Sequence, residues 1–285
     1  MGELDINEVM CSVDFAFENG ITTFDVADVY GLGLAESNLR KALGKRINRS
    51  KIITKCGVKW DHNNSKDRAI TSRDNSPIYI ERAVNESLTR LAIDSIDLFF
   101  VHWPDNKTPI EDLMECLLRL QKTGKIKEFG LSNFSFEQLL SANKISKFKY
   151  FQDEFNLLTP REKIDNFHHL ENNGLNLLGY GPLLQGFLSG KYDSSTKFSG
   201  NDRRKRENHF QSDKATKLQN CLVKLENVSE KYHLSVPEIA IHWCLSHSFL
   251  DSVILGIKNI KQCELALAVN NNDIDYSFVN DYLRS

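Results

Sequence analysis

Four side chains suited to acid–base chemistry lie at or just beyond the ends of short apolar runs. They are Asp25 and Tyr30 around the end of the run 21–27, Lys55 in the run 51–57 and His102 in the run 96–103. Each alone has an ordinary structural explanation: a turn cap, a packed aromatic, a lysine with its stem on apolar surface, a hydrogen-bonded core histidine. Together they indicate a site, because burying a lysine and an aspartate is costly unless they pair. Asp28, nearby, is interpreted as a turn cap.

These four residue types together suit the reduction of a carbonyl group. A phenol is a weak acid in water, and a lysine cation stabilises its phenolate form, while an aspartate keeps that lysine charged and in position. A histidine can orient the carbonyl oxygen, so that the phenol protonates it while a hydride arrives at carbon. Because no side chain supplies a hydride, this chemistry requires a nicotinamide cofactor.

The elements that must position these residues alternate along the chain. Short runs rich in β-branched and aromatic residues predict strands at 21–27, 51–57, 96–103, 126–133, 150–155, 175–181 and 252–257. Patterns with helical spacing lie at 7–20, 76–93, 110–125, 214–233 and 235–247, with Ser76 as an expected N-cap and Gly124 as an expected helix stop. Strands that are apolar on both faces and alternate with helices are typical of a parallel sheet. We therefore predict an α/β fold, a (β/α)8 TIM barrel, with residues 1–285 as a single domain.

The strand count falls one short of a complete barrel. The missing strand is the first, because the chain starts about where the helix 7–20 begins. An open barrel exposes unpaired backbone groups. We therefore expect low stability, or a gap covered by another segment or by another chain. Two polar stretches, 58–75 and 192–213, are expected to be loops at the carboxyl ends of the strands, where barrel enzymes place their active sites.

Composition restricts the partners. The net charge of -2 creates no field that attracts nucleic acid or an anionic membrane, and the basic stretch around 203–206 is interpreted as a solvated loop. No apolar run approaches the roughly 20 residues of a membrane helix, and no signal peptide is recognisable. The six cysteines include no C-x-x-C pair, so a zinc site is not indicated. Scattered thiols in apolar surroundings predict a reduced, cytoplasmic protein, a monomer by default.

Several motifs, in order, resemble the aldo-keto reductases, which are NADP(H)-dependent barrel oxidoreductases. They are FDVADVYG, ITKCG, VHWPD, GLSNF, GYGPLLQGFLSGKY and SVILGIKN, and the match runs from about residue 7 to the C-terminus. A single such motif is moderately specific, whereas the ordered set is strongly so. The G-L-G run that begins at Gly31 is not a Rossmann fingerprint and corresponds in this family to a loop after the tyrosine.

The resemblance implies a role for each matching residue. Tyr30 would donate the proton, Lys55 and Asp25 would tune the acidity of Tyr30, and His102 would orient the carbonyl. Ser132, Asn133 and Gln152 would hold the nicotinamide carboxamide, and Tyr180 would stack on the ring. Further cofactor contacts are implied at Asp25, Gly181, Pro182, Leu183, Gly186, Lys191, Gly256, Lys258 and Gln262. The substrate would meet Tyr30, His102 and Trp60, with Trp103 also at the mouth, and no metal is implied.

The chain departs from the family pattern in the late cofactor segment. Where the family has an arginine and then a Glu-Asn pair, this chain has Gln262 and then Leu265 and Ala266. Lys258 is left as the main cation for a 2′-phosphate, and a lysine is a point charge without the fork of an arginine. We therefore expect NADP(H) as cofactor and keep NAD(H) as a possibility.

Three functions remain open from the sequence. The first is NAD(P)H-dependent reduction of an aldehyde or ketone, or the reverse oxidation. The second is a catalytically impaired nucleotide-binding or regulatory homologue, which the missing strand makes more plausible than usual. The third is an isomerase or aldolase that forms a Schiff base on Lys55. The sequence does not specify a substrate.

Overall fold

The structure is a computed structural model that describes residues 6–61, 70–189, 192, 196, 212–269, 274, 276 and 279. Its strands are β1 (Thr23–Asp25), β2 (Lys51–Cys56), β3 (Val58–Asp61), β4 (Ile70–Arg73), β5 (Ile96–Val101), β6 (Ile126–Ser132), β7 (Tyr150–Glu154), β8 (Asn176–Tyr180) and β9 (Leu250–Ile254). Its α-helices are α1 (Ile6–Glu18), α2 (Leu34–Leu43), α3 (Pro77–Leu91), α4 (Ile110–Lys122), α5 (Phe136–Ile145), α6 (Arg161–Asn172), α7 (Ser212–Tyr232), α8 (Val236–Leu245) and α9 (Ile260–Leu267).

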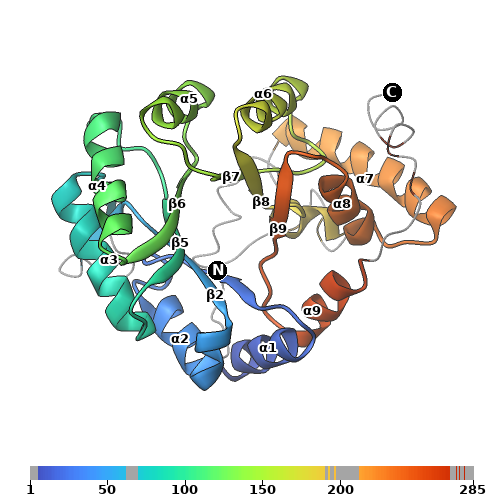
Figure 1. Ribbon diagram of the computed structural model, residues 1–285. Helices are drawn as coiled ribbons and strands as arrows, with labels where there is room; N and C mark the ends of the chain where they lie inside the picture. The colour runs from blue at the N-terminus through green and yellow to red at the C-terminus, as the bar shows by residue number, and fades with distance from the viewer. Residues whose placement is uncertain are drawn as a thin grey trace.

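One parallel sheet organises the molecule. Its strands follow the order β1-β2-β5-β6-β7-β8-β9, and every neighbouring pair is parallel. The strands form an inner ring and the helices an outer ring around it (Figure 1). The predicted α/β barrel architecture is confirmed, and because all strands run the same way, their carboxyl ends meet at one end of the ring.

The ring has an opening between its first and last strands. Among the described residues, β1 and β9 are the two edges of the seven-stranded sheet, and no eighth strand joins them. Helices α1 and α9 lie side by side at this position (Figure 1). The predicted absence of one barrel strand thus holds for the part of the chain that the structure describes.

Two hydrophobic layers hold the ring together. A small cluster of Ile53, Leu98, Phe100 and Leu178 fills its inside, and a much larger cluster packs between the strands and the helices. Gly130 on β6 makes the inner layer possible, since a Cβ there would lie 2.4 Å from the ring of Phe100. The strand runs are apolar on both faces because both faces are buried.

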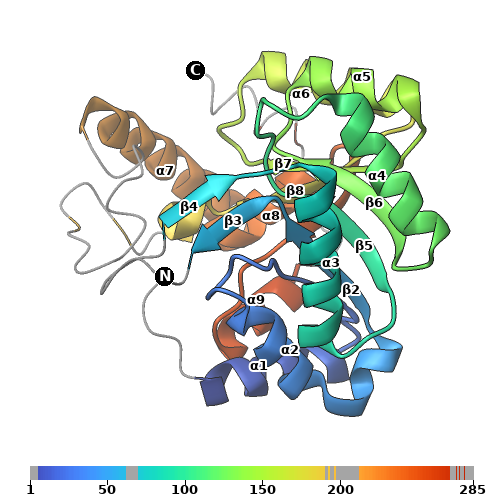
Figure 2. The same ribbon diagram turned by 90° about the vertical axis from the view of Figure 1, so that its left-hand side faces the viewer.

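The structure corrects several local expectations. The described parts of the stretch 58–75 are not an irregular loop, because β3 and β4 form an antiparallel hairpin that lies across the end of the ring where the strands terminate (Figure 2). Residues 62–69 of this stretch lie outside the described residues. Ser76 occupies the N-cap position of α3, but its hydroxyl donates to Asp74 at 2.7 Å and makes no capping bond. The glycine run after Tyr30 is a turn only as far as Gly33, where α2 begins.

Five of the six cysteines are buried and all are free, while Cys11 is exposed. No helix in the described part of the chain combines the length and apolar character needed to cross a membrane. The loop expected at 192–213 lies mostly outside the described residues.

Candidate active site at the carboxyl ends of the strands

The predicted site residues come from six neighbouring strands or the turns that follow them. Asp25 ends β1, Lys55 lies near the end of β2, His102 follows β5, Ser132 ends β6, Gln152 lies in β7 and Tyr180 ends β8. Because the strands are parallel and adjacent, the topology brings together residues that are up to 155 positions apart. The local sequence encodes each strand, and the order of the strands in the sheet brings their ends together.

Lys55 lies inside the ring. It is two residues after Ile53, which belongs to the inner hydrophobic cluster, so the two side chains point to the same face of β2. The lysine is 1% exposed, its ammonium group forms an ion pair with Asp25, and it donates to the carbonyl oxygen of Val26 at 2.9 Å. A buried ammonium is tolerated because it is paired in this way.

Tyr30 and His102 lie beside this ion pair. The ammonium nitrogen of Lys55 is 5.7 Å from the centroid of the Tyr30 ring. The rings of Tyr30 and His102 meet edge to face, with centroids 5.7 Å apart. Tyr30 is 37% exposed, whereas His102 is 9% exposed. The phenol is therefore the accessible member of a group whose cation is buried.

The predicted carboxamide-holding residues form a connected hydrogen-bond network. The Tyr180 hydroxyl donates to Oδ1 of Asn133 at 2.6 Å, and Nδ2 of Asn133 donates to the His102 carbonyl at 2.9 Å and to Oγ of Ser132 at 3.0 Å. Asn133 has a φ of 62°, and its backbone amide donates to the carbonyl of Gln152. An asparagine tolerates this left-handed conformation better than most residues.

Gln152 connects this network to the acid–base group. Its Nε2 donates to Oδ2 of Asp25 at 3.0 Å, across the inside of the ring. Asp25 thus contacts Lys55 through one carboxylate oxygen and Gln152 through the other. The two predicted groups of site residues form one continuous polar cluster.

The loop after β8, predicted to cover the pyrophosphate, contains two glycines with a left-handed backbone. Gly181 has a φ of 70° and Gly186 a φ of 96°, and Pro182 and Leu183 lie between them. A left-handed backbone favours glycine and exposes amide groups. Lys191, predicted to contact the cofactor, lies outside the described residues.

The late cofactor segment lies between β9 and α9. Gly256 has open space where a Cβ would stand, and Lys258 is exposed. The Gln262 side chain accepts from the Lys258 backbone amide at 2.8 Å, while the Gln262 amide donates to Oδ1 of Asn259, the N-cap of α9. Gln262 therefore shapes the start of α9, a local role that sequence reasoning did not assign.

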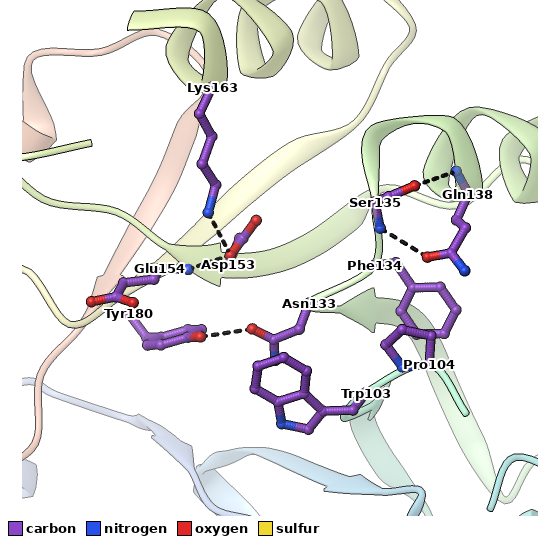
Figure 3. A pocket seen from close by; sticks show the side chains of 10 residues that line it. All are labelled: Trp103, Pro104, Asn133, Phe134, Ser135, Gln138, Asp153, Glu154, Lys163 and Tyr180. Carbon is purple, nitrogen blue, oxygen red and sulfur yellow. Dashed lines mark hydrogen bonds and ion pairs between the residues drawn. The ribbon is translucent and has the colours of Figure 1, made fainter. Parts of the chain in front are cut away.

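A cavity of about 470 Å³ adjoins the polar cluster (Figure 3). Asn133 and Tyr180 contribute to both, and Trp103 directly follows His102 in the chain. The lining residues are Trp103, Pro104, Asn133, Phe134, Ser135, Gln138, Asp153, Glu154, Lys163 and Tyr180. Trp60 is in β3, on the hairpin, where it pairs with Thr71.

Asp28 is not the turn cap that the sequence suggested. Its side chain is 1% exposed, and neither oxygen has a well-formed hydrogen bond among the described residues. Burial, together with the nearby carboxylate of Glu36, raises the pKa of Asp28 to about 8, and the amide of Val29 offsets this only in part. A turn position alone does not reveal such burial, because the packing of α2 and α3 causes it.

No group of three or more histidine, cysteine, aspartate or glutamate side chains suited to a metal ion occurs within the described ranges. The polar cluster has a different character, since its members are one acid, one amine, one imidazole, one hydroxyl, two phenols and two amides. Hydroxyl and amide groups suit a carboxamide, and an aromatic ring with a positive-φ glycine loop suits a stacked, phosphorylated ligand. The donor set therefore fits a nicotinamide nucleotide.

Comparison with known proteins agrees with this fit. The model of the aldo/keto reductase family matches residues 2–282. An aldo-keto reductase of Bacillus subtilis, YhdN, is 30% identical over 276 residues, which are 95% of this chain and 82% of that protein. An NADH-specific methylglyoxal reductase of Escherichia coli is 27% identical over 98% of this chain and 89% of its own length.

Further relatives differ in cofactor and in substrate. An NADP(+) aldo-keto reductase of Schizosaccharomyces pombe is 29% identical over 87% of this chain and 74% of that protein. Among solved structures, a glycerol dehydrogenase of Gluconobacter oxydans superposes with a TM-score of 0.89 at 29% identity, covering 99% of this chain and 86% of that one. This chain is an oxidoreductase that belongs to the aldo/keto reductase family, whose members carry out carbonyl chemistry with nicotinamide cofactors.

Proposed function

We propose that this protein reduces an aldehyde or ketone to an alcohol with NAD(P)H, or catalyses the reverse oxidation. The observation that carries this proposal is the buried Lys55–Asp25 ion pair beneath an accessible Tyr30 and beside His102. The bound nicotinamide supplies the hydride. The side chains of this protein supply the proton and control its transfer.

Tyr30 is the proton donor in this proposal. The buried Lys55 cation stabilises negative charge on the phenol oxygen as the proton leaves, and Asp25 keeps that cation charged and fixed. His102, edge to face with Tyr30, orients the carbonyl oxygen toward the hydroxyl. Little reorganisation is needed, because hydrogen bonds through Gln152 and Asn133 already hold the group.

Ser132, Asn133, Gln152 and Tyr180 would hold the nicotinamide end of the cofactor. Gly181, Pro182, Leu183 and Gly186 would cover its pyrophosphate, and Gly256, Lys258 and Gln262 would meet the adenosine end. We propose NADP(H) as cofactor, since the exposed Lys258 can pair with a 2′-phosphate, and NAD(H) as the alternative. The relatives that carry an NADP(+) name and an NADH-specific name make both worth testing.

Schiff-base chemistry on Lys55 is disfavoured by its surroundings. Such a reaction needs a neutral, accessible amine. Here the amine is 1% exposed, paired with Asp25 and bonded to a backbone carbonyl. A regulatory homologue that binds nucleotide without turnover remains the second candidate, and the test below separates it from the enzyme.

The test is Tyr30→Phe, assayed by NADPH and NADH absorbance with a panel of short aldehydes and ketones. Loss of a general acid lowers kcat by about 10²–10⁴-fold. Cofactor binding, measured by quenching of tryptophan fluorescence, stays within about twofold, because Phe keeps the ring. Tyr79→Phe is the matched control and leaves turnover unchanged, since Tyr79 is a buried tyrosine of α3.

Two outcomes would contradict the proposal. If Tyr30→Phe retains wild-type turnover, Tyr30 is not the proton donor. If the wild-type protein binds NADPH or NADH but turns over no carbonyl compound or alcohol, the regulatory function is favoured.

A further inference from the structure

The hairpin β3–β4 presents one face to the active-site end of the ring. In its antiparallel register, Val58 pairs with Arg73 and Trp60 with Thr71. Directly paired residues share a face of a sheet, as do residues two apart on one strand. Arg73 and Trp60 therefore project from the same face of the hairpin.

Arg73 identifies where that face points. Its guanidinium carbon lies 4.6 Å from the centroid of the Trp103 ring, and its Nη1 donates to the carbonyl oxygen of Pro104 at 3.3 Å. Trp103 and Pro104 line the cavity, and Trp103 directly follows His102. Arg73 is thus held against two residues of the cavity wall, Trp103 and Pro104.

The charge of Arg73 is not neutralised by the described residues. Lys163, the cation among the residues that line the cavity, forms an ion pair with Asp153 at 2.9 Å, whereas Arg73 forms no ion pair within the ranges that the structure describes. A guanidinium has five N–H donors, and the hydrogen bond to Pro104 is the one that Arg73 makes with described residues. The side chain is exposed, so a ligand can reach the remaining donors.

The carboxylates of the cavity lie away from Arg73. Asp153 is paired with Lys163, and Glu154 is on the opposite side of the cavity from Trp103 (Figure 3). An anionic group beside Trp103 would therefore meet Arg73 away from the two cavity carboxylates. The carboxylate of Asp105, which follows Pro104, already accepts from the backbone amides of Asn75 and Thr108. The stacking on Trp103 also fixes the guanidinium plane, which favours two-point pairing with an oxyanion.

We propose that Arg73 is a specificity-determining residue that selects carbonyl substrates carrying an oxyanion group, a carboxylate or a phosphate, close to the reacting carbonyl. This inference rests on the proposed reductase function and names its substrate class. The carbonyl lies at Tyr30 and His102, while the anion lies at the hairpin, on the open side of the Arg73 guanidinium and beside the Trp103 ring. No bond to Arg73 forms or breaks in the reaction.

The test compares matched charged and neutral substrates in wild type and Arg73→Gln. One pair is 4-oxobutanoate and its uncharged amide, and the other is glyceraldehyde 3-phosphate and glyceraldehyde, which separates carboxylate from phosphate recognition. We expect Arg73→Gln to lower kcat/KM for the anionic member by about tenfold or more, mainly through KM, and to change the neutral member less than about twofold. Arg73→Lys keeps the charge but loses the two-point donor geometry of the guanidinium. Its kcat/KM for the anionic substrate is therefore expected to lie between the values of wild type and Arg73→Gln. The matched control is Arg82→Gln, which removes an exposed arginine of α3 that pairs with Glu86. It is expected to leave the charged-to-neutral ratio of kcat/KM unchanged for both substrate pairs.

A binding measurement makes the test independent of turnover. Succinate and inorganic phosphate, as unreactive anions, are titrated into the NADPH-loaded protein while tryptophan fluorescence is followed. We expect saturable quenching by at least one anion, weakened about tenfold by Arg73→Gln. The proposal would be overturned if the charged-to-neutral ratio of kcat/KM is the same in wild type and Arg73→Gln. It would also be overturned if the two proteins bind the anions equally well. Failure of all carbonyl substrates while anions still bind through Arg73 contradicts the reductase function alone.

Discussion

Asp28 lies between Asp25 and Tyr30 in the chain but belongs to a different environment. Its carboxyl group packs in the core, where Glu36 adds repulsion and the pKa rises to about 8. The unfolded chain releases this proton near pH 4. Between about pH 4 and pH 8 the folded state therefore holds a proton that the unfolded state has lost, so the Asp28 contribution to stability declines as pH rises through this window.

Asp28→Asn tests this linkage, because an amide cannot ionise. The free energy of unfolding of the variant relative to wild type is expected to rise between pH 5 and pH 8, by up to about 4 kcal/mol. Urea unfolding at the two pH values measures the difference, and any constant cost of the amide cancels. A relative stability that does not change with pH would show that Asp28 is ionised in the folded state.

Asp105 provides the control. Burial alone would raise the pKa of Asp105, but hydrogen bonds from the backbone amides of Lys107, Thr108 and Asn75 outweigh it and lower the pKa to about 2. Its stabilising contribution is present above about pH 4 and is lost only as pH falls toward 2. Asp105→Asn is therefore expected to show a constant stability difference between pH 5 and pH 8.

Among the elements, helix α2 shows how the turn that carries Tyr30 is anchored. Glu36 in its first turn is fully buried, accepts from the Thr54 hydroxyl on β2 at 2.7 Å and pairs with Arg90 on α3 at 2.6 Å. Gly33, just before the helix, has a φ of 88°, and a Cβ there would lie 2.9 Å from the Arg90 side chain. One carboxylate thus joins a helix, a strand and a second helix behind the site.

Glu36→Ala is expected to cost about 3–5 kcal/mol of unfolding free energy, because it removes the buried carboxylate that Thr54 and Arg90 share and leaves Arg90 with a longer, half-exposed pair to Glu86 at 3.8 Å. Glu81→Ala is the matched control, since it breaks the exposed ion pair with Arg119, whose contribution to stability is small because solvent screens it. Chemical denaturation of both variants measures the costs. Similar small losses in the two would mean that the Glu36 network contributes little to stability.

At the scale of the whole molecule, the sheet has a well-supported middle and two edges. Strands β5 and β6 pair on both sides, whereas β1 and β9 each pair on one side only among the described residues. β5 is almost wholly buried, but β9 has exposed and half-buried positions. Local opening is easiest where backbone groups are paired on one side and few apolar contacts are lost.

Native-state hydrogen exchange is expected to show this gradient. Amides of β5 and β6 are expected to exchange slowest, at a rate set by global unfolding. Amides of β1 and β9 are expected to exchange at least about tenfold faster, because these strands open locally. Mass spectrometry of peptides from each strand measures the rates. Protection of β1 and β9 equal to that of β5 would show that a further segment or chain pairs with these edges.

The amino-acid sequence alone indicated where the strands lie along the chain and which reactive side chains stand at their ends. Apolar runs with β-branched residues mark strands that are buried on both faces, so the seven sheet strands were placed correctly, although β9 begins two residues earlier than expected. Helices α2, α5 and α6 were not recognised, because their patterns are short or, in α6, rich in polar residues. The hairpin β3–β4 was missed because its strands are polar and exposed, which gives no periodic apolar pattern.

Only the tertiary structure decided which side chains meet. Asp25 and Gln152 are 127 residues apart, and their hydrogen bond exists because the ring closes most of the way around. The burial of Asp28 and the stacking of Arg73 on Trp103 likewise depend on packing between distant elements. Strand-forming tendency is a property of neighbouring residues and can be read along the chain, whereas contact, burial and the pKa values they set arise when separate elements pack together.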